Sequence, residues 1–341
     1  MTSHPTVVSR FNRDFAIDHP FVCAGMAFIC DTADLGIAVC QAGGVGALAG
    51  SLLSPPVLKA RIREIRAATT NPFHVNLLAA FPYDDQVSVC IEEGVPIVSF
   101  HWGLPEKAAV KRLHSAGIKI WAQIGSIEQA RAALDLGMDG IVVQGSEAGG
   151  HNYGALPLQS ILPRVRDAVG DDMTLLAAGG IADGRTAAAA FALGADAIWV
   201  GTRMVATTEA NAHPEYKEQL ISATGEGTVL TSVFGPEAPA FNPMRVLRSD
   251  IIDTWQDRVD ELPTERSDLK PIGTTIFAGQ LQEVKLYDSI LPVPETTGDI
   301  LKMPLLSGQG VGLIDRIEPA GEVLMRMMQD AANQLRKAAP S

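Results

Sequence analysis

Several features that mark whole classes of protein are missing from this sequence. No stretch reaches the 18 consecutive apolar residues of a candidate membrane helix. The formal net charge is −12 and no run of basic residues interrupts it, so we expect neither a nucleic-acid nor a membrane partner. The first twenty residues lack the basic start, apolar stretch and small-residue cleavage site of an export signal. These absences predict a cytoplasmic protein.

Cysteine is also scarce, and its spacing excludes the common zinc motifs. The chain has four cysteines, all in its first third: Cys23, Cys30, Cys40 and Cys90. No CxxC pair is present, so we predict no metal site and interpret the cysteines as reduced thiols of the core.

The remaining composition is that of a globular α/β protein. Hydrophobic residues make up 47% of the 341 residues and charged residues 19%, with 32 Gly and 21 Pro. This length suits a barrel of about 250 residues that carries one added segment.

Eight short apolar runs recur at a regular interval and predict eight strands: 21–26, 45–50, 73–78, 95–100, 119–124, 140–145, 174–180 and 197–202. The segments between them have helical periodicity, and several begin with Ser, Asp or Pro and end with Gly. Continuously apolar strands indicate a parallel sheet that is covered by helices. Eight such units predict a (β/α)₈ TIM barrel.

Three parts of the chain follow from this pattern. Residues 1–214 are predicted to form the barrel. The repeat stops after residue 205, and the Pro-rich segment 215–308 is predicted to be a smaller, mainly helical inserted lobe. Residues 309–341 form a C-terminal segment whose amphipathic helix, predicted at 318–337, returns to the barrel.

One interval between strands is longer than the others, the one from residue 140 to residue 174. It holds the Gly-rich sequence SEAGGHNYGALP at the carboxyl end of a strand, where barrels place their active sites. His151 in this loop is the candidate catalytic residue, as a base or as a hydrogen-bond donor. His101 also follows a strand end and could reach the pocket, whereas His74 lies at a strand start.

Glycines after the last two strands predict a phosphate site. Gly179, Gly180, Gly201 and Thr202 would offer backbone amides there, although tight turns would also explain the glycines.

Amide side chains near strand ends suit the donors and acceptors of a flavin ring, namely Asn76, Gln123 and Gln144. Amides satisfied within a polar barrel mouth are the alternative. The segment Ala24, Gly25 and Met26 could pass against a flat ring. Glu147 and Asp183 are better explained as loop caps than as catalytic carboxylates.

The sequence resembles the nitronate monooxygenases, which are FMN-dependent barrels, over most of its length. The similar segments are AGMAFICDTADLGIAVCQAGGVGALAG, FHVNLL, QGSEAGGH and LLAAGGIADGRTAAAAFALGADAIWVGTRM. The resemblance implies that His151 is catalytic and that Gly149 and Gly150 lie beside FMN. It also implies the oxidation of alkyl nitronates by O₂ to carbonyl compounds and nitrite.

Two positions depart from the family pattern. Gly25 stands where members often have Pro, and Gln123 where relatives can carry Lys. Similar barrels act as NADH:quinone reductases or as FMN-dependent enoyl-acyl-carrier reductases, so both stay open, with NAD(P)H as a candidate reductant. A flavin-binding module without catalysis and a homo-oligomer are also compatible with the sequence. An IMP dehydrogenase-like barrel is not, because no cysteine follows Cys90.

Overall fold

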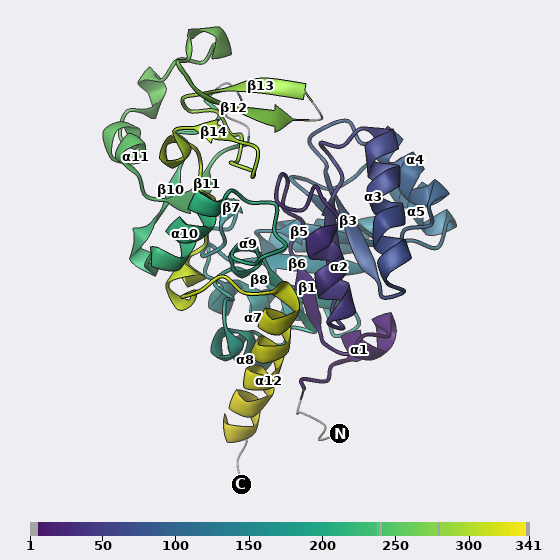
Figure 1. The fold of residues 1–341 in the computed structure, drawn as a ribbon. Helices are drawn as coiled ribbons and strands as arrows, with labels where there is room; N and C mark the ends of the chain where they lie inside the picture. The colour runs from purple at the N-terminus through teal and green to yellow at the C-terminus, as the bar shows by residue number, and fades with distance from the viewer. Residues whose placement is uncertain (1–5, 237, 239–240, 278–279, 339–341) are drawn as a thin grey trace.

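The computed structural model describes residues 6–236, 238, 241–277 and 280–338. Its centre is a parallel eight-stranded sheet in the order β1-β9-β8-β6-β5-β4-β3-β2 (Figure 1). A parallel bridge between Val22 and Val45 joins the two end strands, and the Cys23 amide donates to the Val45 carbonyl at 3.0 Å. The predicted barrel is therefore confirmed. Its strands are β1 Phe21–Cys23, β2 Gly46–Ala49, β3 Phe73–Leu78, β4 Ile97–His101, β5 Lys119–Ile124, β6 Gly140–Gln144, β8 Thr174–Ala178 and β9 Ala197–Val200.

Helices cover the outside of this barrel because each strand is apolar on both faces. Branched and aromatic side chains of the strands are buried against helix residues such as Leu58, Ile62 and Ile161. The four cysteines are buried and free, as predicted. No helix in the described ranges is long and apolar enough to cross a membrane. The barrel helices are α2 Asp34–Gln41, α3 Pro55–Ala68, α4 Asp84–Glu92, α5 Lys107–Ser115, α6 Ile127–Leu136, α7 Leu158–Val169, α8 Gly184–Ala192 and the short α9 Thr202–Val205.

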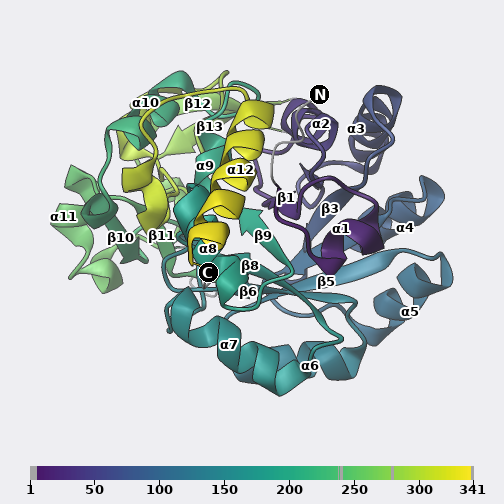
Figure 2. The same ribbon diagram turned by 90° about the horizontal axis from the view of Figure 1, so that it is seen from below.

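The amphipathic helix predicted near the C-terminus is α12, Ala320–Ala338. It packs beside α8 and α2 on the outside of the barrel (Figure 2). Val323, Leu324, Met327 and Met328 are buried in this contact face. The chain thus returns to the barrel after the lobe, and α12 completes the helical layer between α8 and α2.

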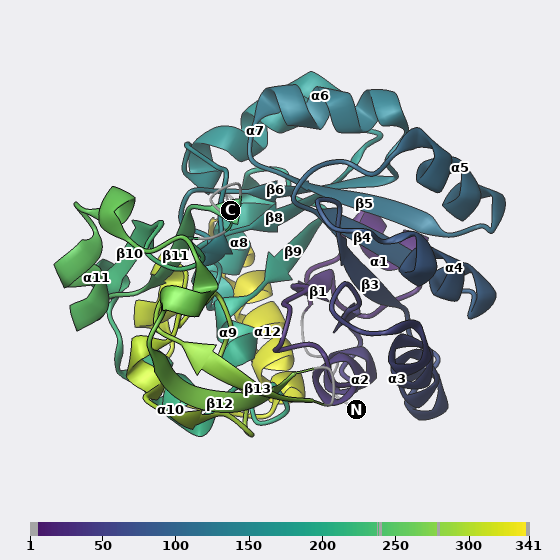
Figure 3. The ribbon, with the colours of Figure 1, turned by 90° about the horizontal axis from the view of Figure 1, so that it is seen from above.

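The lobe differs from the mainly helical segment that the sequence predicted. It has helices α10 Pro214–Ser222 and α11 Asp250–Trp255 but also strands of two three-stranded sheets, β10-β11-β7 and β13-β12-β14, of which β7 comes from the barrel loop (Figures 1 and 3). Strand β11 pairs with β7 and β12 with β14 across long intervals of the chain, which local periodicity does not reveal. The neighbouring strands β12 and β13 also pair, and this alternation between Pro-rich segments was missed. The strands are β7 Gly150–His151, β10 Thr228–Thr231, β11 Met244–Leu247, β12 Pro271–Phe277, β13 Gln280–Lys285 and β14 Thr297–Gly298.

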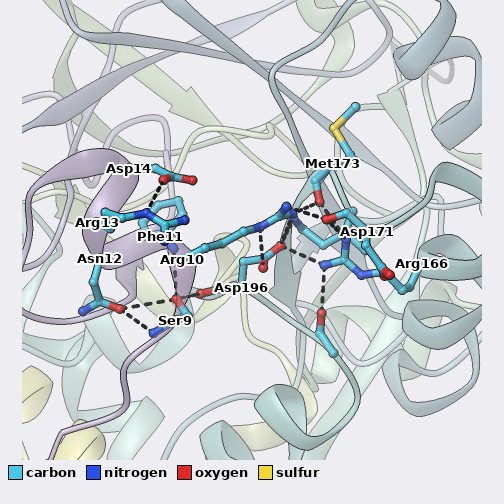
Figure 4. A network of polar contacts seen from close by, with 12 residues as sticks. Ser9, Arg10, Phe11, Asn12, Arg13, Asp14, Arg166, Asp171, Met173 and Asp196 are labelled. Atoms are coloured by element: carbon cyan, nitrogen blue, oxygen red, sulfur yellow. Dashed lines mark hydrogen bonds and ion pairs between the residues drawn. The ribbon is translucent and has the colours of Figure 1, made fainter.

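An ionic cluster around Asp196 closes the end of the barrel opposite to the lobe (Figures 1 and 4). The Asp196 carboxylate accepts from Arg10 Nε at 2.8 Å, from Arg166 Nη2 at 2.8 Å and from the Leu175 amide at 2.8 Å. Arg10 also donates to the carbonyl oxygens of Asp171 and Met173. Helix α1, Arg10–Phe15, is held here, and its Phe11 packs on Trp121 inside the barrel.

We expect Asp196→Asn to lower the free energy of unfolding by about 2–3 kcal/mol, because two arginines lose their counter-charge in a largely buried site. Urea unfolding would measure this change. Asp14→Asn is the matched control, since the Arg13–Asp14 pair on the same helix is exposed and its loss should cost under about 0.5 kcal/mol. Equal effects of the two substitutions would contradict a structural role for the Asp196 cluster.

Candidate functional site

A cavity of about 490 Å³ lies at the carboxyl ends of the barrel strands. Residues at the ends of all eight strands line it, and the lobe contributes to its wall through residues such as Phe241 and Met244. Every residue predicted for the site lines this one cavity: Ala24, Gly25, Met26, Asn76, Gln123, Gln144, Gly149, Gly150, His151, Gly179, Gly180, Gly201 and Thr202. The structure therefore brings together residues that lie up to 178 positions apart (202 − 24).

The glycines after β8 and β9 present free backbone donors to this cavity. In the described part of the chain, the amides of Gly179, Gly180 and Gly201 donate to no acceptor. Gly179 and Gly180 have φ values of 111° and 69°, which strain any residue with a Cβ. Unpaired amides that converge on a cavity are suited to bind an anion such as a phosphate.

The two carboxylates of these loops are used as caps, as the sequence indicated. Asp183 accepts from the Thr186 amide at 2.9 Å and caps α8. Glu147 accepts from the Leu158 amide at 2.9 Å at the start of α7. Both therefore hold the loops that flank the cavity.

His151 is fixed by the lobe as well as by the barrel. The two-residue strand β7 pairs with β11, so that His151 lies opposite Met244. The His151 carbonyl accepts from Gln144 Nε2 at 3.1 Å. At the neighbouring Gly149, a Cβ would lie 2.5 Å from the backbone nitrogen of Gly308, so only glycine fits. Contacts with β11, Gln144 and Gly308 thus hold the loop in place.

Burial keeps the histidines of the cavity neutral. Desolvation, and then the nearby His101, lower the pKa of His151 to about 3. Desolvation also lowers the pKa of His101 to about 4, although a hydrogen bond with the backbone of His151 acts to raise it. Both imidazoles are neutral at pH 7, which favours a hydrogen-bond donor over a strong base.

Aromatic side chains that the sequence did not point to form part of the cavity wall. The Trp102 ring lies edge-on to the His151 ring with 3.9 Å between centroids, and Phe241 of the lobe lies 4.6 Å from Trp102 and 5.0 Å from Phe81. Trp102 has a φ of 60°, a strained conformation for a bulky residue. Trp102 could have been predicted for the site, because it directly follows His101 at a strand end. Phe241 could not, because no local pattern in the sequence links it to the barrel.

The described lining contains no Asp, Glu, Lys or Arg. Its polar side chains are neutral amides, hydroxyls, imidazoles and indoles. Among them, His101 Nδ1 and Trp102 Nε1 are buried without a hydrogen-bond partner in the described chain. Such groups favour a ligand that offers matching polar atoms on an otherwise apolar body.

Comparison with known proteins assigns the family. The family model described as nitronate monooxygenase matches residues 9–330. The chain belongs to the nitronate monooxygenase family. It is 31% identical, over 94% of its length and 95% of the relative, to (3aS,4S,5R,7aS)-5-hydroxy-7a-methyl-1-oxo-octahydro-1H-indene-4-carboxyl-CoA dehydrogenase of Mycobacterium tuberculosis.

Two solved structures resemble the whole chain. FabK from Thermotoga maritima has a TM-score of 0.83 at 34% identity, with 97% of this chain and 98% of that chain covered. Nitroalkane oxidase from Streptomyces ansochromogenes has a TM-score of 0.77 at 28% identity, with 95% and 98% covered. The chain is therefore an oxidoreductase, and its family implies a flavin cofactor.

The cavity fits a flavin. The free amides of Gly179, Gly180 and Gly201 suit a phosphate. Gly25 and Gly149 also line the cavity, where close packing against Asn76 and Gly308 admits only glycine. Asn76, Gln123 and Gln144 supply neutral donors and acceptors in the same cavity.

The buried His74 in the barrel interior gives the protein a specific sensitivity to acid. Burial lowers its pKa from 6.5 to about 4, so below pH 6.5 the unfolded chain takes up a proton that the folded chain refuses. We expect this residue to reduce the free energy of unfolding by about 1.4 kcal/mol per pH unit between pH 6.5 and 4.

Urea unfolding at a series of pH values measures this slope. His74→Gln should be less stable at pH 7 but should show a shallower fall toward acid. Thr275→Val is the control, since it removes a buried hydroxyl bonded to Thr296 but no titratable group, and it should keep the wild-type slope. An unchanged slope in His74→Gln would show that His74 does not cause this loss of stability in acid.

Proposed function

We propose that the protein binds FMN and is a nitronate monooxygenase, which oxidises alkyl nitronates with O₂ to carbonyl compounds and nitrite. The observation that carries this proposal is the neutral, half-buried His151, which β11 and Gln144 hold at the cavity wall. When bound, FMN supplies the electron acceptor for the nitronate and the reductant for O₂.

FMN is proposed over a larger dinucleotide because the free amides that line the cavity lie in two neighbouring loops, after β8 and β9, and suit one phosphate. Gly179, Gly180 and Gly201 would hold the phosphate, and Thr202 would add its hydroxyl. No GxGxxG follows the first strand to bind a pyrophosphate.

His151 would hold the nitro oxygens of the substrate through an N–H group. A substrate that is already an anion needs no base, and a neutral imidazole with a pKa of about 3 is a poor base but a good donor. The ring of Trp102 would keep water away from this contact. The neutral donors of the wall would thus replace a cationic side chain in binding the anion.

We expect the purified protein to be yellow, with about one FMN released per chain on denaturation, because all the residues proposed to bind FMN line one cavity. Absorbance and chromatography of the released flavin measure this. A protein that stays colourless after incubation with FMN would contradict the cofactor proposal.

We expect His151→Asn, which keeps a donor, to retain most of the kcat/KM for pre-formed nitronate. His151→Phe keeps a ring but no donor, so its kcat/KM for nitronate should fall by about 10²- to 10³-fold. Steady-state oxygen uptake measures both, and an intact flavin spectrum is the control. If the kcat/KM of His151→Asn instead fell by about 10²- to 10⁴-fold for neutral nitroalkane but not for nitronate, the histidine would be the base that removes the substrate's proton.

A second candidate is reduction of an unsaturated acyl thioester, favoured by the uncharged aromatic wall of Phe81, Trp102 and Phe241. Such a wall suits a neutral apolar substrate, and the M. tuberculosis relative is named for a carboxyl-CoA compound. Anaerobic stopped-flow mixing separates the two. Flavin bleaching by nitronate supports the monooxygenase, and bleaching by NADH that an enoyl thioester reverses supports the reductase.

A further inference from the structure

Beneath the cavity, a chain of hydrogen bonds runs from Asn76 into the interior of the barrel. Asn76 Nδ2 donates to Ser99 Oγ at 2.9 Å, Ser99 Oγ lies 2.8 Å from His74 Nδ1, and His74 Nε2 lies 2.9 Å from the Cys23 carbonyl. The parallel register of β3 and β4 sets Asn76 beside Ser99. All three side chains are 5% exposed or less. The chain therefore links β1, β3 and β4.

The donor and the acceptor of each hydrogen bond follow from the last group of the chain, the Cys23 carbonyl. The Cys23 carbonyl can only accept, so His74 Nε2 must carry the hydrogen. Because burial keeps His74 neutral, its Nδ1 has no hydrogen and must accept one from Ser99. The single hydroxyl hydrogen of Ser99 is then used, and Ser99 Oγ can only accept from Asn76. The Asn76 nitrogen, not its oxygen, must therefore face Ser99.

We propose that Ser99 and His74 are positioning residues that hold the Asn76 amide with its oxygen toward the bound flavin. Asn76 Oδ1 accepts no hydrogen bond from the described residues, and it is not among their buried unpaired atoms, so it faces the cavity that Asn76 lines. This inference rests on the proposed FMN site. An oxygen at this position selects a ring edge that offers an N–H group.

The surroundings prevent the side chain from leaving this arrangement. A Cβ at position 25 would lie 2.2 Å from Asn76 Cβ, so the backbone of Gly25 presses directly on the asparagine. Below, the His74 ring is held by Trp199, with 4.6 Å between centroids. The glycine that replaces the family's common proline therefore packs against Asn76.

The first test is the tautomer of His74 and needs no cofactor. Long-range ¹⁵N–¹H spectra of histidine-labelled protein report which ring nitrogen carries the hydrogen. His74 is assigned by replacing each other histidine with glutamine in turn. We expect a neutral ring at pH 7 with hydrogen on Nε2. Hydrogen on Nδ1, or a charged ring, would reverse the chain and overturn the proposal.

The second test is the effect of Ser99→Ala on FMN itself. The variant frees the Asn76 amide to rotate, and we expect FMN to bind about tenfold more weakly, with a shifted visible absorption maximum. Fluorescence titration of the flavin-free protein measures the affinity. Thr275→Val is the matched control, because it removes a buried hydroxyl that bonds Thr296 in the lobe, away from the cavity.

The outcomes separate the positioning role from general stability. Loss of stability in both variants with weaker FMN binding in Ser99→Ala alone supports the proposal. Wild-type affinity and spectrum in a folded Ser99→Ala protein overturn it. If wild-type protein binds no FMN, the cofactor proposal fails, while the tautomer measurement still decides whether the hydrogen-bond chain runs as described.

Discussion

The exclusion of water from the barrel interior is the constraint on which the other features of this protein depend. A polar group in this interior must find a partner or face the cavity, because an unpaired buried group costs about 1–3 kcal/mol. His74 satisfies this constraint with two partners, Ser99 and Cys23. Desolvation also keeps His74, His101 and His151 uncharged at neutral pH. The chemistry of the cavity is consequently that of neutral donors and acceptors.

The same constraint explains how the two ends of the barrel differ. At the α1 end, charged side chains are tolerated because Arg10, Arg166 and Asp196 neutralise one another at the edge of the core. At the carboxyl ends, no charged side chain reaches the described wall, and its free donors include backbone amides of glycines. A phosphate is the kind of charge that such amides can hold, since they lose no side-chain entropy on binding.

The lobe makes the barrel end a closed site. Strand β11 pairs with β7, so the backbone of His151 belongs to a sheet of the lobe and to a loop of the barrel at once. Arg245 of β11 also donates to the Ser146 carbonyl at 3.0 Å, which ties the loop on its other side. Any movement of the lobe would therefore move His151, and the aromatic wall that Phe241 completes would open with it.

The barrel itself could be predicted from the sequence, because strands buried on both faces and helices with one apolar side leave local periodic patterns. Glycines and amides at strand ends were also predictable, since the parallel barrel brings all those ends to one face. The sheets of the lobe were not, because β11 pairs with β7 and β12 with β14 across long intervals of the chain. The neighbouring pair β12–β13 was open to prediction and was missed.

The sequence by itself determined the barrel, the face of the site and the glycines and amides that line it, through patterns that extend over a few residues. Only the tertiary structure decided that His151 is neutral, that the Asn76 amide has one orientation, and that Phe241 of the lobe meets Trp102 of the barrel. These properties depend on burial and on contacts between distant segments, and neither leaves a trace in local sequence.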